Sequence, residues 1–489
     1  MGSYLPLAYI AGPPDLENDD ESPPTPDPSM THPRRTDLHR AVARLLAIMV
    51  LLFTLGALIT IPTADPGPRP SGDLAVLQSR WAWEDMWDQW SASSLWQTIL
   101  GCVGSDDPVL AVGGVSVKTS SLANARKLMA AHPVIDGHND WPLKLRWHLG
   151  AHIAGSDLTD LPEDEFNTDI KRIREGLLGG QFWSVYVPCQ RNFTAYSRSV
   201  ALVLEQIDLV KRFVARYPLT FEVAHSALEL DTARRAGRVA SLIGMEGGHS
   251  IDNSLGVLRM MHQLGARYMT LTHTCHTAWA DSQYPEPLHG GLTPFGRSVV
   301  REMNRLGMLV DLSHVSWDTM RDALNVSLAP AFFSHSSAAA LCNTTRNVPD
   351  EILLQIKQTD GVVMVNFYPR IVDCENVRNA TISRIADHIM HIRNLIGARH
   401  VGLGADFDGI EVMPVGMEHG VSSYPFLIAE LMERGLSNKE IKEMLGRNVI
   451  RVMAKTEAVA KELHREPPGE ELLEVEPTCP EGREEEFRF

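Results

Sequence analysis

The sequence has few cysteines, and no two of them lie close together along the chain. Six cysteines are present among 489 residues, and none forms a C-x-x-C pair, which argues against a structural zinc knuckle. Basic residues are outnumbered too, with 45 Lys and Arg against 61 Asp and Glu and a formal net charge of −16. This charge argues against nucleic acid as a partner. The C-terminus lacks a hydrophobic tail, so we expect no lipid anchor at that end.

One long apolar run lies near the N-terminus. Residues 45–64 are uncharged and mostly apolar, over about the length that a transmembrane helix needs. Arginines precede the run and Asp65 follows it, which predicts a single-pass type II membrane protein with a lumenal or extracellular body. A cleaved signal peptide is the alternative, but the polar leader is too long for one. Around this membrane helix (a signal anchor) we expect a disordered cytoplasmic tail at 1–44 and a stalk with a Trp-rich juxtamembrane segment at 65–118. A helix docked on the catalytic domain is the alternative for the Trp-rich segment.

This topology would place the body in an oxidising compartment, where disulfides persist. It would also give meaning to four N-glycosylation sequons, which begin at Asn192, Asn325, Asn343 and Asn379. We expect an acidic C-terminal tail at 461–489.

The central part of the chain, residues 119–460, alternates short β-branched apolar runs with stretches of helical periodicity. This alternation predicts an α/β fold, a (β/α)8 TIM-like barrel. An open doubly wound sheet is the alternative, but no Gly-rich phosphate-binding fingerprint follows the first strand. The predicted strands are Val134–Gly137, Phe182–Val187, Ala240–Met245, Tyr268–Thr272, Met308–Leu312, Ala331–Ser334, Gly361–Phe367 and Val401–Gly404.

Residues that can bind metals stand where these strands end. Catalytic groups of a TIM barrel gather at the carboxyl ends of its strands. A single His at such a position is more often structural, but a succession of strand ends with His, Asp or Glu indicates a metal site. The segments are Asp136–Asp140, Gly244–His249, Thr272–Cys275, Asp311–His314, Phe333–His335 and Gly404–Gly409.

The residue types favour a catalytic site with two metal ions. One residue separates His138 from Asp140, so both side chains point to the same side of an extended strand. Imidazole and carboxylate without thiolate suit catalytic rather than structural zinc. Glu246 is our candidate for a bridging carboxylate, because Gly247 and Gly248 allow a close approach of the backbone. The candidate ligands are too many for one open tetrahedral site and suit two ions: His138, Asp140, Glu246, His314 and His335.

Seven motifs stand in one order over about residues 125–455: His138-x-Asp140, Gly244–Ser250, Leu271–Cys275, Val310–Val315, Ser334–Ser336, Arg346–Pro349 and Asp406–Gly409. In order and spacing they resemble the membrane (renal-type) dipeptidase family, the zinc-dependent peptidase family M19. The resemblance implies a barrel of the metal-dependent hydrolase type. It also implies dipeptide substrates, hydrolysed by a hydroxide that bridges two zinc ions.

The resemblance assigns the metal ligands residue by residue. One zinc ion would be bound by His138 and Asp140, and the other by His314 and His335. Glu246 would bridge the two ions.

Three further residues would contact the substrate. His273 would help the metals to stabilise the oxyanion, and Asp406 would carry a proton from water to the leaving amine. Arg346 would present its planar fork to the free carboxylate of the dipeptide, which favours short peptides. Without the resemblance, a surface salt bridge would be the simpler interpretation of Arg346.

The family pairs cysteines by position, and both pairs are available in this sequence: Cys189 with Cys275, and Cys342 with Cys374. Two cysteines remain, to pair with each other or across a homodimer: Cys102 and Cys479.

Some positions depart from the family pattern. His276 stands where Asn is common, and Leu143 and Ile371 replace aromatic residues that line the pocket of the renal enzyme. The lipid-anchoring tail of the family is missing as well. These departures concern substrate preference and anchoring and spare the metal ligands. Four other residues near the rim are interpreted as supports behind the ligands or as structural residues: His249, Asp136, Asp311 and Asp408.

Three functions fit these observations. The first is a dipeptidase. The second is a metal amidohydrolase that acts on another C–N bond, and activity against simple dipeptides would separate the two. The third is a catalytically silent membrane glycoprotein, although the sequence retains every predicted ligand and substrate contact.

Overall fold

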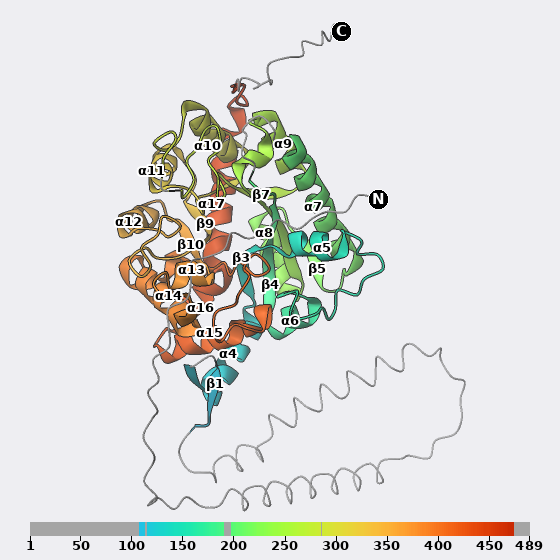
Figure 1. Ribbon diagram of the computed structural model, residues 1–489, viewed down its shortest axis with the longest axis vertical. Coiled ribbons are helices and arrows are strands. Elements are labelled where there is room, and N and C mark those ends of the chain that lie inside the picture. The colour runs from blue at the N-terminus through green and yellow to red at the C-terminus, as the bar shows by residue number, and fades with distance from the viewer. Residues whose placement is uncertain (1–106, 113–114, 190–196, 285, 474–489) are drawn as a thin grey trace, which may run out of the picture. The chain divides into compact units, whose positions relative to one another are not determined.

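A closed sheet of parallel strands forms the centre of the protein. The computed structural model describes residues 107–112, 115–189, 197–284 and 286–473. In the large sheet the strand order is β4-β3-β11-β10-β9-β8-β7-β6, and β6 pairs with β4 to close the ring. All pairings in this ring are parallel. The structure therefore confirms the predicted (β/α)8 TIM-like barrel, with its helices around the outside (Figure 1).

Each barrel strand overlaps one of the predicted strands: β3 Val134–Asn139, β4 Leu178–Tyr186, β6 Val239–Glu246, β7 Ala266–Thr270, β8 Leu309–Asp311, β9 Phe332–Ser336, β10 Val362–Val365 and β11 Val401–Leu403. Three short strands were not predicted. One of them pairs with β6 outside the ring, and the other two form an antiparallel hairpin: β5 Phe221–Val223, β1 Val109–Val112 and β2 Val115–Lys118.

Helices follow the strands in alternation. Several begin with a side-chain cap. In α10, Thr293 caps the first turn, Pro294 follows and the left-handed Gly307 ends the helix. The α-helices are α4 Thr119–Ala131, α5 Trp141–Leu149, α6 Ile170–Glu175, α7 Ser197–Arg216, α8 Ala227–Arg235, α9 Leu255–Gln263, α10 Pro294–Leu306, α11 Trp317–Val326, α12 Asp350–Gln358, α13 Pro369–Val372, α14 Ile382–Ile396, α15 Tyr424–Glu433, α16 Asn438–Lys442 and α17 Asn448–Glu462.

The hydrophobic core has two parts, because successive side chains of a barrel strand point alternately inward and outward. Inside the barrel, the ring of Phe182 packs against Tyr268 and Phe332 at centroid distances of 5.5 and 6.0 Å. Its neighbour Trp183 belongs to the buried cluster between strands and helices. Strands buried on both faces form continuous apolar runs, and these runs made the strands predictable.

The predicted membrane topology requires a correction. In the part of the chain that the structure describes, no helix combines the length and the apolar character that a bilayer crossing demands. The longest described helix, α7, carries charged residues along its length, among them Glu205, Asp208 and Lys211. The apolar run at 45–64, on which the prediction rested, lies outside the described residues, as do the predicted tail at 1–44 and most of the segment 65–118. We therefore withdraw the assignment as a single-pass type II membrane protein.

The beginning of the predicted acidic tail packs against the barrel. Helix α17 continues to Glu462, the hydroxyl of Ser298 donates to Glu471 at 2.8 Å, and Leu473 contacts the main hydrophobic core. Three of the four sequons lie in described segments, and their asparagines are exposed. Their glycosylation stays a prediction.

An ion-pair network at the amino-terminal end of the barrel ties two strands to the last long helix. Asp360, just before β10, accepts hydrogen bonds from Arg399 at 2.8 and 2.9 Å. Its carboxylate also pairs with Arg451 at 2.8 Å and Lys455 at 2.7 Å, both on α17. Burial alone would raise the pKa of this carboxyl, but hydrogen bonds from Arg399 and Lys455 hold it well below its usual value.

We expect Asp360→Asn to reduce the free energy of unfolding by about 1.5–3 kcal/mol at pH 7, the usual range for a hydrogen bond to a charged group. Asn tolerates the left-handed backbone of this position, where φ is 56°, so the variant tests charge rather than conformation. Because the pKa is lower in the folded state, the stabilisation is present above the unfolded pKa of about 3.9 and is lost as the pH falls through the folded pKa. Urea unfolding of both proteins between pH 7 and pH 2 measures the effect, and a difference in unfolding free energy that stayed constant below about pH 4 would contradict it.

Candidate active site

The predicted site residues come from the carboxyl ends of different strands. Two of them lie within strands, at position 138 of β3 and position 335 of β9, and Glu246 is the last residue of β6. Asp140 is the N-cap of α5. The others follow β7, β8, β9 and β11 in loops: His273, His314, Arg346 and Asp406.

Glu246 lies at the centre of these side chains. Its Oε2 is 3.5 Å from Nε2 of His138. Its Oε1 is 3.3 Å from Nε2 of His314 and 3.4 Å from Nε2 of His335. The carboxylate is buried and accepts a hydrogen bond from Ser184 at 3.2 Å. One carboxylate oxygen therefore faces His138, and the other faces His314 and His335.

The other carboxylates of the site gather around His138. Its Nε2 is 3.3 Å from Asp140 and 3.9 Å from Asp406. This nitrogen and Oδ1 of Asp140 are buried and have no hydrogen-bond partner among the described residues. Unpaired buried polar atoms are costly unless an ion or another group satisfies them. This cluster of nitrogen and oxygen donors without thiolate fits a catalytic zinc ion.

Three groups of three residues in the site could each hold a metal ion. Two of these groups contain Glu246, and the remaining group contains His138 with two aspartates. In each group the donor atoms lie within 4.8 Å of one another: His138, Glu246 and His335; Glu246, His273 and His314; and His138, Asp140 and Asp406. The donors therefore fit more than one cation. A fourth group, Cys189, His249 and Cys275, offers no thiolate because its two cysteines form a disulfide.

Outer hydrogen bonds orient two of the predicted ligands. The hydroxyl of Tyr268 lies 2.8 Å from Nδ1 of His138. The hydroxyl of Ser334 lies 2.6 Å from Nδ1 of His335 and donates to Asp311 at 2.5 Å. Such contacts leave Nε2 of each histidine as the atom that faces the site.

Two of the residues interpreted as supports hold the loops in place. Asp136 accepts hydrogen bonds from the backbone N–H of His138 at 2.7 Å and of Ala405 at 2.9 Å. Asp311 likewise accepts the backbone N–H groups of Ser313 and Ser334 at 3.1 and 2.8 Å.

Some functional neighbours were not predicted from the sequence. Asn366, which follows β10, donates to Asp406 at 3.1 Å and to the backbone carbonyl of His335 at 3.3 Å.

The backbone at His314 and Asp406 is left-handed, with φ of 63° and 68°, a strained conformation for residues other than glycine. Gly409 allows a close approach, because a Cβ there would lie 2.2 Å from Asp140 and 2.5 Å from Asp406.

Burial and charge shift the protonation equilibria of the site. Burial lowers the pKa of His273 to about 4 and the pKa values of His314 and His335 well below their usual range, so these three rings are neutral, as metal ligation requires. Burial, with the neighbouring carboxylates, raises the pKa of Asp406 to about 8. Burial opposes a charged His138, yet the Tyr268 oxygen and nearby carboxylates raise its pKa well above the usual value. The pocket around His138 therefore favours positive charge.

Arg346 is a buried cation, and part of its guanidinium has no hydrogen-bond partner among the described residues. Burial lowers its pKa to about 10, so it stays charged at neutral pH. Its Nη1 donates to Ser336 at 2.8 Å, while Nη2 is buried without a hydrogen-bond partner among the described residues. The carboxylates that raise its pKa most, Asp406 and Glu246, belong to the site, and neither forms an ion pair with Arg346 in the described part of the chain. One edge of the guanidinium is thus left for another anion.

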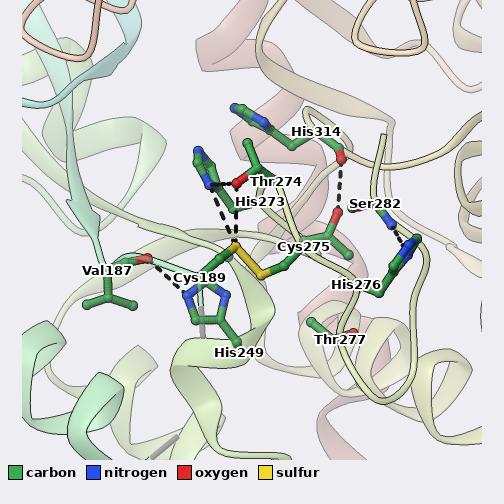
Figure 2. The surroundings of a disulfide bond; sticks show 12 residues. Val187, Cys189, His249, His273, Thr274, Cys275, His276, Thr277, Ser282 and His314 are labelled. Carbon is green, nitrogen blue, oxygen red and sulfur yellow. Dashed lines mark hydrogen bonds between the residues drawn. A yellow bond between two sulfur atoms is a disulfide. The ribbon is translucent and has the colours of Figure 1, made fainter. Parts of the chain in front are cut away.

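Both predicted disulfides are present. Cys189 joins Cys275 with a Cα–Cα distance of 5.8 Å, and Cys342 joins Cys374 with 5.4 Å. The first connects the loops after β4 and β7 beside His273 (Figure 2). His273 also packs against the ring of His314, with centroids 4.4 Å apart and an interplanar angle of 38°.

A family model described as membrane dipeptidase (peptidase family M19) matches residues 122–467. The chain belongs to the membrane dipeptidase family. A relative from Aspergillus oryzae, dipeptidase aclJ, is 47% identical over 337 residues, which are 68% of this chain and 80% of that protein. An uncharacterized dipeptidase of Schizosaccharomyces pombe is 46% identical over 357 residues, 71% of this chain and 86% of its own. The crystal structure of a metallopeptidase from Rhodobacter sphaeroides, liganded with a phosphinate mimic of the dipeptide L-Ala-D-Ala, is 26% identical with a TM-score of 0.61 and covers 67% of this chain and 99% of its own.

Family membership confirms that the protein is an enzyme, a metal-dependent dipeptidase that hydrolyses dipeptides. The predicted ligand residues lie among the described groups that could hold the metal. The family match begins at residue 122, beyond the apolar run at 45–64.

Proposed function

We propose that this dipeptidase works with two zinc ions that Glu246 bridges. The observation that carries the proposal is the position of Glu246, whose Oε2 faces His138 while its Oε1 faces His314 and His335. His138 and Asp140 would hold one ion, and His314 and His335 the other. When bound, the two ions would polarise the scissile carbonyl and activate the attacking water.

The proton transfers fall to Asp406. Burial and the neighbouring carboxylates raise the pKa of Asp406, but the positive charge of bound zinc would favour its ionised form. As water adds to the carbonyl carbon, this carboxylate takes one of its protons, and the new C–O bond forms. When the C–N bond breaks, the same carboxyl delivers a proton to the leaving amine. Asn366 holds one oxygen of Asp406 through a 3.1 Å hydrogen bond, which leaves the other oxygen, 3.9 Å from His138, directed toward the metal ligands.

His273 is positioned to stabilise the negative charge that develops on the carbonyl oxygen. Its Nε2 is 3.7 Å from Glu246, and its pKa of about 4 keeps the ring neutral. A neutral imidazole can donate one N–H to an oxyanion. Arg346 would bind the free carboxylate of the substrate with the edge of its guanidinium that has no partner. These roles favour dipeptides over long chains.

We expect the purified full-length chain to contain about two zinc ions, as a bridged pair requires. Removal of zinc with a chelator should abolish dipeptide hydrolysis, and added zinc should restore it. Elemental analysis of zinc-replete protein, together with a titration of activity against added zinc, measures both. A plateau at one ion per chain would contradict the binuclear site, and restoration only by another metal would contradict zinc.

A further inference from the structure

The two ring nitrogens of His273 face different surroundings. Nε2 points toward Glu246, but the 3.7 Å distance is too long for a hydrogen bond. Nδ1 lies on the opposite side of the ring, 3.1 Å from the hydroxyl of Thr274 and 4.0 Å from the sulfur of Cys189 (Figure 2). A neutral imidazole carries one hydrogen, so one nitrogen donates and the other accepts.

The surroundings of the two nitrogens favour a hydrogen on Nε2. A lone pair on Nε2 would face the Glu246 carboxylate, whereas an N–H at the same place is attracted by it. An oxyanion near the metal ligands also requires a donor at Nε2. Nδ1 must then accept a hydrogen bond. The disulfide sulfur of Cys189 has no hydrogen to give, so of the two groups near Nδ1 only Thr274 can donate.

Other contacts keep Thr274 and the ring in place. Thr274 precedes Cys275, which the disulfide ties to Cys189. The Thr274 hydroxyl is 3.6 Å from the Cys189 sulfur, a weaker acceptor than an imidazole nitrogen. The rings of Tyr186 and His273 pack edge to face, with centroids 4.7 Å apart and an interplanar angle of 62°. Both the ring plane and the hydroxyl position are therefore fixed.

We propose that Thr274 is a positioning residue for His273, whose Nδ1 accepts the threonine hydroxyl so that Nε2 carries the hydrogen toward the reaction centre. This inference rests on the oxyanion role of His273 in the proposed function. Among the described residues the Thr274 hydroxyl bonds to His273 and Cys189 and to no proposed metal ligand, so it acts through His273.

The test compares three variants of the full-length enzyme. Thr274→Val keeps the shape but removes the hydroxyl, and Thr274→Ser keeps the hydroxyl. Thr277→Val is the matched control, because the Thr277 hydroxyl lies in the same loop but bonds to backbone groups, donating to the carbonyl of Ala280 at 3.4 Å and accepting the N–H of Trp279 at 3.4 Å. For each protein we would measure zinc content, kcat and KM for a dipeptide, and the affinity for a phosphinate dipeptide mimic, which resembles the tetrahedral transition state.

We expect Thr274→Val to lower kcat/KM about 10- to 100-fold, as loss of an outer hydrogen bond to a catalytic group usually does. The loss should fall on kcat and on phosphinate affinity, with KM changed less than about twofold. Zinc content should match the wild type, and Thr274→Ser and Thr277→Val should stay close to wild-type activity.

Full activity of Thr274→Val, or a Thr274→Ser enzyme as impaired as Thr274→Val, would overturn the inference. Loss of zinc from Thr274→Val would also overturn it, because the residue would then support the metal ligands. A His273→Leu variant distinguishes a failure of the oxyanion role of His273 from a failure of the positioning role of Thr274. If it kept wild-type kcat, the oxyanion role itself would fail, whereas an impaired His273→Leu with a fully active Thr274→Val would refute only the positioning role.

Discussion

The Glu246→Gln enzyme is expected to lose zinc from both sites. Its kcat/KM should fall more than about 10³-fold, as it does when one residue is removed from a set of catalytic residues that act together. The carboxylate is buried with one oxygen 3.5 Å from His138 and the other 3.3 Å from His314. A neutral amide offers one oxygen and one NH2 group, so it would turn a donor toward one cation and supply no negative charge to either. A carboxylate that served only one ion would, when replaced, leave the second ion in place.

Zinc content by elemental analysis and dipeptide turnover measure this effect. Glu302→Gln is the matched control, since Glu302 is also a buried carboxylate but is bonded to Arg305 at 2.7 Å and Arg259 at 3.1 Å, away from the site. We expect the control to lower the thermal midpoint without loss of zinc. If Glu246→Gln retained one full equivalent of zinc, Glu246 would bind a single ion and would not bridge.

The barrel was predictable because its strands are buried on both faces. β6 is buried along its whole length and appears in the sequence as a continuous apolar run between helical segments. β5 was not predicted, because its three residues are too few to show a strand pattern of apolar residues. The membrane topology was wrong as well. It rested on the apolar composition of residues 45–64 alone, which lie outside the described residues, and no described helix is long and apolar enough to cross a membrane.

The metal-competent residues were predictable because their chemical types are rare together at strand ends. The residues that orient them were not. Tyr268 is separated from His138 by 130 positions, and in the sequence it is simply an aromatic residue in a strand. Only the closure of the barrel brings its hydroxyl to that histidine. Ser334 and Asn366 are common residue types whose roles depend on strand register, which a single sequence does not define.

Arg346→Lys is expected to lose most of the activity against free dipeptides while keeping its zinc. The lysine ammonium is a point charge and cannot present two parallel N–H groups to a carboxylate. The guanidinium is buried, with Nη1 bonded to Ser336 at 2.8 Å and Nη2 without a hydrogen-bond partner among the described residues. Arg297→Lys is the control, because Arg297 is a partly exposed residue paired with Asp322 at 2.9 Å, and it should leave turnover unchanged.

The same reasoning predicts that the wild-type enzyme discriminates against dipeptides amidated at the C-terminus. An amide lacks the negative charge and leaves the buried guanidinium without its partner, which should cost roughly 2–5 kcal/mol, or about 30- to 5,000-fold in kcat/KM. Arg346→Lys should narrow this preference, because the specific contact is already lost in the variant. Competition assays with matched free and amidated dipeptides measure the ratio for both proteins. Equal turnover of the two substrates by the wild-type enzyme would refute carboxylate recognition by Arg346, and it would favour hydrolysis of a different C–N bond, as in a broader amidohydrolase.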